Sequence, residues 1–565
     1  MLVHPTSRGL DPARLEPGRD LVLDIDPAHG LDLPDGVLAD DHLDQEARAR
    51  IAAGGLPAMA RCRERLDAPL TVDGLCLPWL WEMRIERAIV TMLGQAAALE
   101  RALARWEPEQ LVLVGADARI RRSAAAAADR TGVCVSERPA ATSDAPVPAR
   151  RSAIELRRRA LRASRELGVP SRLRRGSIVF DSYWPLMALL DRMLEEPGRR
   201  PAVMLTRLPS GPRRSVRTAL RGGWVGTPGP ADRRRAARAA DAALAAAGRA
   251  EPAPLEAFGL ELGAAAHAET LAVVRAHAAG TLAMAATLRR AFGGARPASV
   301  VSAWDGEPVA RLTISLAQEA GIRTLVLGHG AFLLPQTLVD MDVCDEPLLW
   351  SEAVAPPITN RSRPIHVVGY PEPRATPPPT KAAPRKRPPR VLVLAQPSLG
   401  GVGLTSPRIA MRQYEVAVAA VLDAVPRAHV VLRPHPSGGP ATERALAARF
   451  AQKRFEIDAS SSILDALAAS DLCIGTITTA TLQAALVGTP AIALNLMGFE
   501  WRWPLGADTT VPVARDGAQL RAWLERWAAG EALPGREDML AALGADIAGD
   551  PVERMLAILG SPPQR

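Results

Sequence analysis

Two stretches of sequence decide the fold: residues 390–436 read RVLVLAQPSLGGVGLTSPRIAMRQYEVAVAAVLDAVPRAHVVLRPHP, and residues 471–495 read DLCIGTITTATLQAALVGTPAIALN. Apolar runs of four or five residues alternate here with apolar residues at helical spacing, which is typical of parallel βαβ units. Ligands bind such sheets outside the carboxyl ends of the strands. At those ends the sequence carries Arg433, His435 and the threonines that begin at Thr476.

The chain has 565 residues, which is too long for one hydrophobic core, so we expect two or three domains. The predicted class is α/β, with two Rossmann-like, doubly wound parallel-sheet domains. We predict an N-terminal extension (1–60), a Rossmann-like domain (61–370) with a helical, arginine-rich insertion (about 150–290), a proline-rich linker (371–390) and a second Rossmann-like domain (391–565). The last helix, near 551–559, is expected to pack back on the N-terminal half.

The net charge of +8 comes almost wholly from arginine, because the chain contains only three lysines. One interpretation is a compositional bias towards arginine and alanine. The other is that some arginines of the insertion meet phosphates or an anionic membrane surface. Aromatic residues make up 4% of the chain and do not interleave with the basic runs, which argues against nucleic acid as a partner.

The five cysteines are scattered without paired spacing, which favours a reducing, cytoplasmic compartment and argues against a zinc site. The N-terminus lacks a basic stretch followed by an apolar core, so no signal peptide is expected. Residues 473–499 carry no charge and are long enough to span a membrane. Their threonines and the Gly-Thr-Pro break at residues 488–490 favour a buried strand-helix-strand unit instead.

Three candidate residues follow apolar runs in the N-terminal half. Asp117 follows the run 111–114, and either faces a ligand or caps the next helix. Asp305 follows the run 299–303, where its carboxylate either deprotonates an acceptor hydroxyl or caps the helix that starts near residue 308. His329 lies between two glycines at the end of the next run, a poor place for core packing, so we interpret it as functional.

The C-terminal half carries the candidates for an anion site. His435 lies between two prolines, which fix the local backbone, and Arg433 precedes it. Hydroxyls and free N–H groups before a helix bind anions or serve as N-caps, and both fit Thr476, Thr478 and Thr479. The remaining candidates form a loop rich in small residues, whose spacing matches no standard phosphate loop: Ser398, Gly400 and Gly401.

These motifs, in this order, resemble the GT-B glycosyltransferases of bacterial capsule and surface-polysaccharide synthesis. The chain looks similar to polysialyltransferase-like enzymes and to the CDP-glycerol glycerophosphotransferase family. The resemblance covers residues 391–495 and 299–370, less than half of the chain. It departs from both families, with Trp304 where polysialyltransferases carry a second acid, and with Gly-Thr-Ile-Thr from Gly475 where glycerophosphotransferases show Asp-Tyr-Ser-Ser.

The resemblance implies roles for the candidate residues. Asp305, with Gly306, corresponds to the acidic-Gly motif that supplies the base on the acceptor domain; His329, Gly330 and Asp117 would also lie on that side. His435 corresponds to the His-Pro motif that assists the leaving nucleotide. The threonines correspond to the Ser/Thr motif that holds phosphate.

The implied reaction moves a sugar or polyol phosphate from an activated nucleotide to a glycan or lipid-linked glycan acceptor. It needs no metal and no resident cofactor. The expected location is cytoplasmic, with contact to the inner face of the membrane as the open alternative. Two rival functions remain: an enzyme like UDP-GlcNAc 2-epimerase, and an inactive binding or scaffold protein on the same fold.

Overall fold

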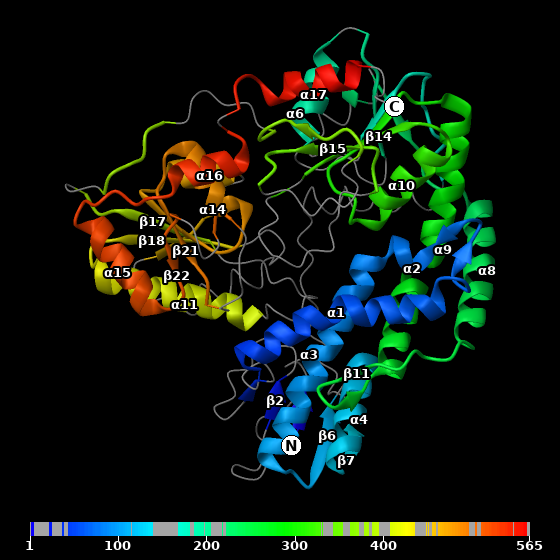
Figure 1. Ribbon diagram of the computed structural model, residues 1–565, viewed down its shortest axis with the longest axis horizontal. Coiled ribbons are helices and arrows are strands. Elements are labelled where there is room, and N and C mark those ends of the chain that lie inside the picture. Colours follow the sequence, from blue (N-terminus) through cyan, green and yellow to red (C-terminus); the bar gives the residue numbers. More distant parts are fainter. Residues whose placement is uncertain are drawn as a thin grey trace.

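The computed structural model contains three parallel β-sheets with helices packed around them (Figure 1). It describes residues 2–4, 22–24, 37–38, 43–114, 116–138, 168–180, 186–196, 198–204, 217–218, 222–328, 330, 343–353, 362–371, 378–383, 387–394, 407–434, 448, 450, 455–458, 462–496, 503–505, 510–545 and 547–561. The helices are α1 (Gln45–Leu66), α2 (Leu77–Leu80), α3 (Glu82–Trp106), α4 (Ala118–Thr131), α6 (Met187–Glu195), α8 (Pro230–Ala247), α9 (Gly263–Ala295), α10 (Pro308–Glu319), α11 (Pro407–Ala424), α13 (Ile463–Ala468), α14 (Thr479–Gln483), α15 (Gly517–Ala528), α16 (Arg536–Leu543) and α17 (Pro551–Gly560).

The first sheet has the order β3-β2-β1-β6-β7, and every neighbouring pair is parallel. Its strands are β1 (Leu2–His4), β2 (Val22–Asp24), β3 (Val37–Leu38), β6 (Gln110–Val114) and β7 (Cys134–Arg138). Three of these five strands come from residues 1–60, which the sequence analysis treats as an extension. The sequence shows one strand-like apolar run there, at residues 21–23, which overlaps β2; β1 and β3 are too short to show such a run and are missed.

The second sheet has the order β10-β9-β8-β13-β14-β15-β16 and is also parallel throughout. Its strands are β8 (Ile178–Phe180), β9 (Pro201–Met204), β10 (Gly223–Val225), β13 (Ser299–Ser302), β14 (Arg323–Leu327), β15 (Glu346–Leu349) and β16 (His366–Val367). The expected helical insertion at about 150–290 therefore contributes three strands to this sheet as well as α6, α8 and α9.

The third sheet has the order β19-β18-β17-β20-β21-β22, again all parallel. Its strands are β17 (Arg390–Leu394), β18 (His429–Arg433), β19 (Phe455–Ile457), β20 (Leu472–Gly475), β21 (Ala491–Leu494) and β22 (Val513–Ala514). Two antiparallel hairpins complete the strands: β4 (Thr71–Val72) with β5 (Leu75–Cys76), and β11 (Glu256–Ala257) with β12 (Leu260–Glu261).

All three sheets follow one path. The chain starts at an inner strand, moves out to one edge, returns beside the first strand and moves to the other edge. This doubly wound order creates a topological switch point between β1 and β6, between β8 and β13, and between β17 and β20, where ligands of such sheets bind. The predicted α/β class with doubly wound parallel sheets is confirmed, and the two larger sheets are the pair expected of a GT-B chain.

Helices α1, α3 and α9 pack together between the first and second sheets. The close approach of α1 to α3 depends on Gly55, because a Cβ there would stand 2.3 Å from Val90 Cγ2. By length and composition α9 would also pass for a membrane-spanning helix, but half of its most apolar window is buried inside the protein. Its packing against α1, α3, α8 and α10 explains why a core helix needs so many apolar residues.

The second and third sheets share one buried apolar cluster, to which Leu327 and Trp350 contribute from one side and Leu482 and Met555 from the other. The final helix α17 extends this contact by packing on α6. The expectation that the last helix returns to the N-terminal half is confirmed.

Ion pairs and caps fix α17 in that place. Arg192 Nη2 lies 2.6 Å from Glu553 Oε1, and Arg323 Nη1 donates a 2.9 Å hydrogen bond to the carbonyl of Ile558. A cation at the last carbonyls of a helix is favourable because those groups have no partner within the helix.

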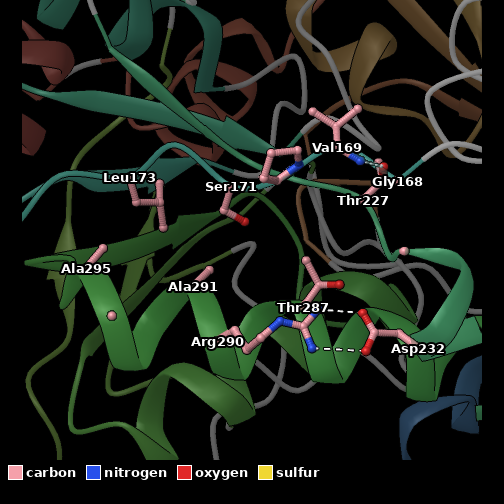
Figure 2. Close-up of a pocket in the computed structure, with 13 residues that line it drawn as sticks. Gly168, Val169, Ser171, Leu173, Thr227, Asp232, Thr287, Arg290, Ala291 and Ala295 are labelled. Carbon is pink, nitrogen blue, oxygen red and sulfur yellow. Dashed lines mark hydrogen bonds and ion pairs between the residues drawn. The ribbon is translucent and has the colours of Figure 1, made fainter. Parts of the chain in front are cut away.

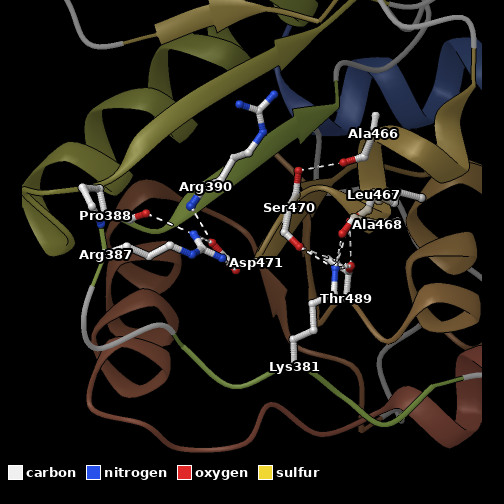
Figure 3. Close-up of polar contacts among 10 residues, drawn as sticks. All are labelled: Lys381, Arg387, Pro388, Arg390, Ala466, Leu467, Ala468, Ser470, Asp471 and Thr489. Carbon is white, nitrogen blue, oxygen red and sulfur yellow. Dashed lines mark hydrogen bonds and ion pairs between the residues drawn. The ribbon is translucent and has the colours of Figure 1, made fainter.

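Lys381 attaches the proline-rich linker to the third sheet (Figure 3). Its Nζ donates to the carbonyl oxygens of Ala468 (2.6 Å) and Ser470 (2.8 Å) and to Thr489 Oγ1 (3.0 Å). Ala468 is the last residue of α13, so the ammonium group caps that helix. Burial lowers the pKa of Lys381.

Asp471 makes the second attachment of the linker (Figure 3). Its carboxylate receives two hydrogen bonds from the Arg387 guanidinium, at 2.7 and 2.6 Å, and one from the backbone N–H of Arg390 at 2.8 Å. The described contacts of Lys381 and Arg387 thus anchor the second part of the predicted linker (371–390) to the third sheet. These contacts oppose movement of that part relative to the sheet.

Candidate functional site

The switch point of the third sheet lies at the end of β20, where Thr476 follows the strand. Gly475, the last residue of β20, has no room for a side chain, because a Cβ there would stand 2.0 Å from Thr481 Oγ1. The chain then turns sharply: Thr478 N donates to the carbonyl of Thr476 at 2.7 Å, and Thr481 Oγ1 donates to the same carbonyl at 2.8 Å. This turn fixes the threonines next to the carboxyl edge of the sheet.

Thr476 is 1% exposed, and its Oγ1 has no hydrogen-bond partner among the described residues. Thr478 occupies the N-cap position of α14, yet its side chain makes no cap hydrogen bond; its Oγ1 lies 3.4 Å from Thr481 Oγ1. Simple N-capping therefore does not account for the threonines. A buried hydroxyl without a partner costs free energy, so it suits a site where a ligand supplies the missing contact.

The second sheet reaches this turn through Gly330, which follows β14. The position of a Cβ on Gly330 lies 3.0 Å from Thr479 Oγ1. A second contact between the two halves lies nearby in sequence, where Gln483 Nε2 donates to the phenol oxygen of Tyr370. The carboxyl edges of the second and third sheets thus meet at α14.

Asp305 follows β13 at the switch point of the second sheet, and it is completely buried. Glu307, not Asp305, occupies the N-cap position of α10. Helix capping therefore does not explain Asp305. Gly306 lies against the indole of Trp304, because a Cβ there would stand 2.7 Å from Trp304 Nε1. The turn from Trp304 to Glu307 is accordingly packed tightly.

The carboxyl group of Asp305 lies close enough to Cys344 to influence its thiol. Burial raises the pKa of Cys344, and the charge of Asp305 raises it further. Complete burial of Asp305 also means that an acceptor hydroxyl would reach its carboxylate only after the surrounding chain moves.

Arg433, at the end of β18, forms an ion pair with Asp458. Its backbone carbonyl accepts a 2.7 Å hydrogen bond from the hydroxyl of Tyr414. The Arg433 side chain is only 14% exposed and its charge is balanced by Asp458. Its predicted role in holding phosphate stays a prediction, and this pairing weakens it.

Asp117 caps helix α4, since its Oδ1 accepts a 2.9 Å hydrogen bond from the backbone N–H of Ile120. Arg119, beside it, lies 2.8 Å from Glu269 Oε2 on helix α9. Of the two interpretations left open for Asp117, the structure shows the structural one. Five further candidates lie outside the described residues: His329, His435, Ser398, Gly400 and Gly401. Among the residues that are described, no group of three or more His, Cys, Asp or Glu is placed to hold a metal ion.

An open cavity of about 560 Å³, which no sequence motif predicts, lies on the second-sheet unit (Figure 2). Ser171 lines one side, and Thr287 and Arg290 of α9 line another. Arg290 is neutralised by Asp232, at 3.1 and 2.5 Å. None of the predicted site residues lines this cavity. No sequence signal marks it, because its walls come from three separate segments (168–173, 227–232 and 287–295) that carry no motif.

No family model matches the chain, and no curated protein matches it. Among solved structures it is similar to MurG of Acinetobacter baumannii, with TM-score 0.37, 12% identity, and coverage of 68% of this chain and 99% of that one. It is similar to Staphylococcus aureus MnaA with UDP, with TM-score 0.39, 11% identity, and coverage of 68% and 95%. A match to the GtfA/B complex, with TM-score 0.32 and 11% identity, covers 49% of this chain and 60% of that chain. Likenesses this distant do not assign an activity.

Proposed function

We propose that the chain is a GT-B-type glycosyltransferase that moves a sugar or polyol phosphate from an activated nucleotide to a glycan acceptor. The proposal extends to bacterial surface-polysaccharide synthesis, which rests on the motif resemblance alone. One observation carries it: two doubly wound sheets meet by their carboxyl edges where Gly330 approaches Thr479, beside the buried hydroxyl of Thr476, which has no partner among the described residues.

The third sheet is the donor side of this proposal. A diphosphate at the β17/β20 switch point would accept hydrogen bonds from the hydroxyls of Thr476, Thr478 and Thr479. His435, whose place is not described, would stabilise the leaving group if it lies near them. The donor is a substrate, and the proposal includes no resident cofactor or metal.

The second sheet is the acceptor side. In sugar transfer, the acceptor oxygen would attack the anomeric carbon, the bond from that carbon to the phosphate oxygen would break, and the nucleotide would leave with the electron pair. In transfer of a polyol phosphate, the acceptor oxygen would instead attack the phosphorus of that group, and the nucleoside monophosphate would leave with the electron pair. The acceptor proton would pass to a base, for which Asp305 is the proposed residue. This role requires an opening of the turn that buries the carboxylate.

That burial favours one rival function. An enzyme similar to UDP-GlcNAc 2-epimerases needs no external acceptor hydroxyl, so a carboxyl group sealed from solvent is compatible with it. The two functions differ in one requirement: a transferase needs a glycan acceptor to change its donor into product, and an epimerase does not.

The test is to incubate the purified protein with nucleotide sugars, with and without a panel of glycan and lipid-linked acceptors, and to follow both products by mass spectrometry and NMR. Sugar on the acceptor supports transfer, and a C2-epimeric donor formed without acceptor supports the rival. Asp305→Asn should abolish transfer while nucleotide affinity changes little, because the donor side is the other sheet. An active Asp305→Asn enzyme would remove Asp305 as the base.

The proposed location is the cytoplasm or the inner face of the membrane. All five cysteines are free thiols, which suits a reducing compartment. Contact with the membrane through the arginine-rich segments remains part of the proposal, and nucleic acid is not a proposed partner.

A further inference from the structure

The turn that holds Asp305 is tied to the N-terminal helices through one buried guanidinium. Arg311, in the first turn of α10, is 2% exposed, and its Nε donates a 3.2 Å hydrogen bond to the backbone carbonyl of Asp305. Its Nη1 donates to the carbonyl of Trp79 (2.9 Å) and to Glu82 Oε2 (2.8 Å). One rigid, planar group therefore connects the turn after β13 with α2 and with the first residue of α3.

Trp79 holds this guanidinium from a second direction. The Arg311 Cζ lies 4.9 Å from the centre of the Trp79 ring, within the range of a cation–π contact. A group held by two carbonyls, a carboxylate and an aromatic face has little freedom to move. The backbone carbonyl of Asp305, which accepts a hydrogen bond from this guanidinium, is held in place with it.

The carboxylate of Glu82 balances the charge of Arg311. The Glu82 carboxylate also receives a 2.6 Å contact from Arg63 Nη1, and Arg63 in turn pairs with Asp67 at 2.9 Å. Among the contacts of the described residues, the carboxylate that touches both cations, Arg63 and Arg311, is Glu82. A buried cation that loses its partner is strongly unfavourable, so the position of Arg311 should follow that of Glu82.

Helix α3 connects Glu82 rigidly to the first sheet. It begins at Glu82 and ends at Trp106, shortly before β6, and its 25 residues span about 37 Å. The helix is buried along most of one face against α1, α4 and α9. A displacement at the first sheet would accordingly reach Glu82 through a continuous rigid element.

We propose that Arg311 is a positioning residue for the Asp305 turn, and that Glu82 makes the N-terminal helices part of the acceptor side. The first sheet and its helices would then determine how rigidly the turn that contains Asp305 is held near the acceptor. The link to catalysis rests on the proposed function, whereas the link between Glu82 and the turn does not.

The direct test is hydrogen–deuterium exchange of peptides that cover residues 304–311, in wild type and in Glu82→Gln. The matched control is Glu269→Gln. Glu269 is more buried than Glu82 and joins two arginines of α4, Arg119 and Arg122, to α9, but it does not touch the turn. We expect exchange in 304–311 to rise about tenfold in Glu82→Gln and to stay at the wild-type rate in Glu269→Gln.

An unchanged rate in Glu82→Gln, or an equal rise in both variants, would overturn the proposal. Arg311→Lys is the second variant, because one ammonium group cannot reach the Asp305 carbonyl and Glu82 together. It should also raise exchange in the turn. Circular dichroism will show whether the Arg311→Lys variant folds. If it does not, the exchange rate of Glu82→Gln alone tests whether Glu82 holds the turn.

The kinetic arm uses the transfer assay. A misplaced turn should lower kcat about tenfold in Glu82→Gln while the donor KM stays unchanged, because the donor side is untouched. A merely structural loosening would move the melting temperature without this separation of kcat from KM, and would contradict the positioning role. If wild type transfers nothing, the proposed function fails, and the exchange result still decides the link between Glu82 and the turn.

Discussion

Gly330, which follows β14, lies so close to Thr479, the first residue of α14, that a Cβ on Gly330 would stand 3.0 Å from Thr479 Oγ1. Gly330 follows a strand of the second sheet, and Thr479 begins the helix that follows β20 of the third sheet. This contact places the proposed acceptor side against the proposed donor side. Its tightness makes it easy to perturb with one methyl group.

Gly330→Ala should weaken the binding of the nucleotide donor. The added methyl group presses on the Thr479 hydroxyl, and over-packing of this kind costs about 1 kcal/mol, which corresponds to roughly a fivefold rise in Kd. Isothermal titration calorimetry measures the change. The control is Gly280→Ala, at a position where a Cβ meets nothing within 4 Å, and its donor affinity should equal that of wild type. Equal affinity in both variants would mean that the contact does not shape the donor site.

Thr476→Val should separate binding from stability. The substitution removes a buried hydroxyl that has no partner in the described residues, so the free energy of unfolding should rise by up to about 1 kcal/mol. If the hydroxyl meets the donor phosphate, nucleotide Kd should rise about tenfold in the same variant. Thermal denaturation and calorimetry give the two numbers.

The matched control for Thr476→Val is Thr270→Val in α9. Thr270 is also completely buried, and its hydroxyl donates to the carbonyl of Ala266 at 2.9 Å, far along the chain from the third sheet. It should leave nucleotide binding unchanged. Full nucleotide affinity in Thr476→Val would exclude the hydroxyl from the donor site.

The raised pKa of Glu86 predicts that the free energy of unfolding depends on pH. Burial in α3 raises the pKa of Glu86 to about 7 from its ordinary 4.5. Between pH 4.5 and 7, Glu86 therefore holds a proton in the folded protein that it releases in the unfolded chain. The contribution of Glu86 to the free energy of unfolding is complete below pH 4.5 and is lost as the pH rises through 7. Glu86→Gln should remove this decline and raise the unfolding free energy at pH 8 by about 2–3 kcal/mol.

Urea denaturation at pH 4.5, 6 and 8 measures the effect of Glu86→Gln. Glu46→Gln is the control, because the Glu46 side chain is 79% exposed on α1. That variant should keep the wild-type decline. A wild-type protein whose stability does not change between pH 4.5 and 7 would show that Glu86 is ionised in the folded state.

The sequence predicts four strands of the third sheet, β17, β18, β20 and β21, because each has four or five residues and forms an apolar run. The edge strands β19 and β22, of three and two residues, are missed. Val391 to Leu394 and Leu472 to Gly475 form central strands, and a continuous apolar run is what burial on both faces requires. The first sheet is predicted only in part: the apolar runs at 111–114 and 132–135 indicate β6 and β7, and the run at 21–23 overlaps β2, whereas β1 and β3, of three and two residues, are missed. The pairing of β1 with β2 and β6 is a tertiary fact that no local pattern contains.

The candidate site is predictable in part. Position at a strand end identifies Asp305 and Thr476, because the carboxyl edge of a parallel sheet follows from strand order. The burial of Asp305, the Asp458 partner of Arg433 and the capping role of Asp117 depend on packing. Arg311 and Glu82 are 229 residues apart, so their contact has no signal in a single sequence.

The most direct test of the central claim is a calorimetric titration of the purified chain with CDP-, CMP-, UDP- and GDP-linked sugars. The account predicts that one nucleotide class binds with a Kd of roughly 1 µM to 1 mM, the usual range for enzyme substrates, and that Thr476→Val weakens that binding. Absence of binding for every donor at millimolar concentration, with the protein folded, would contradict it.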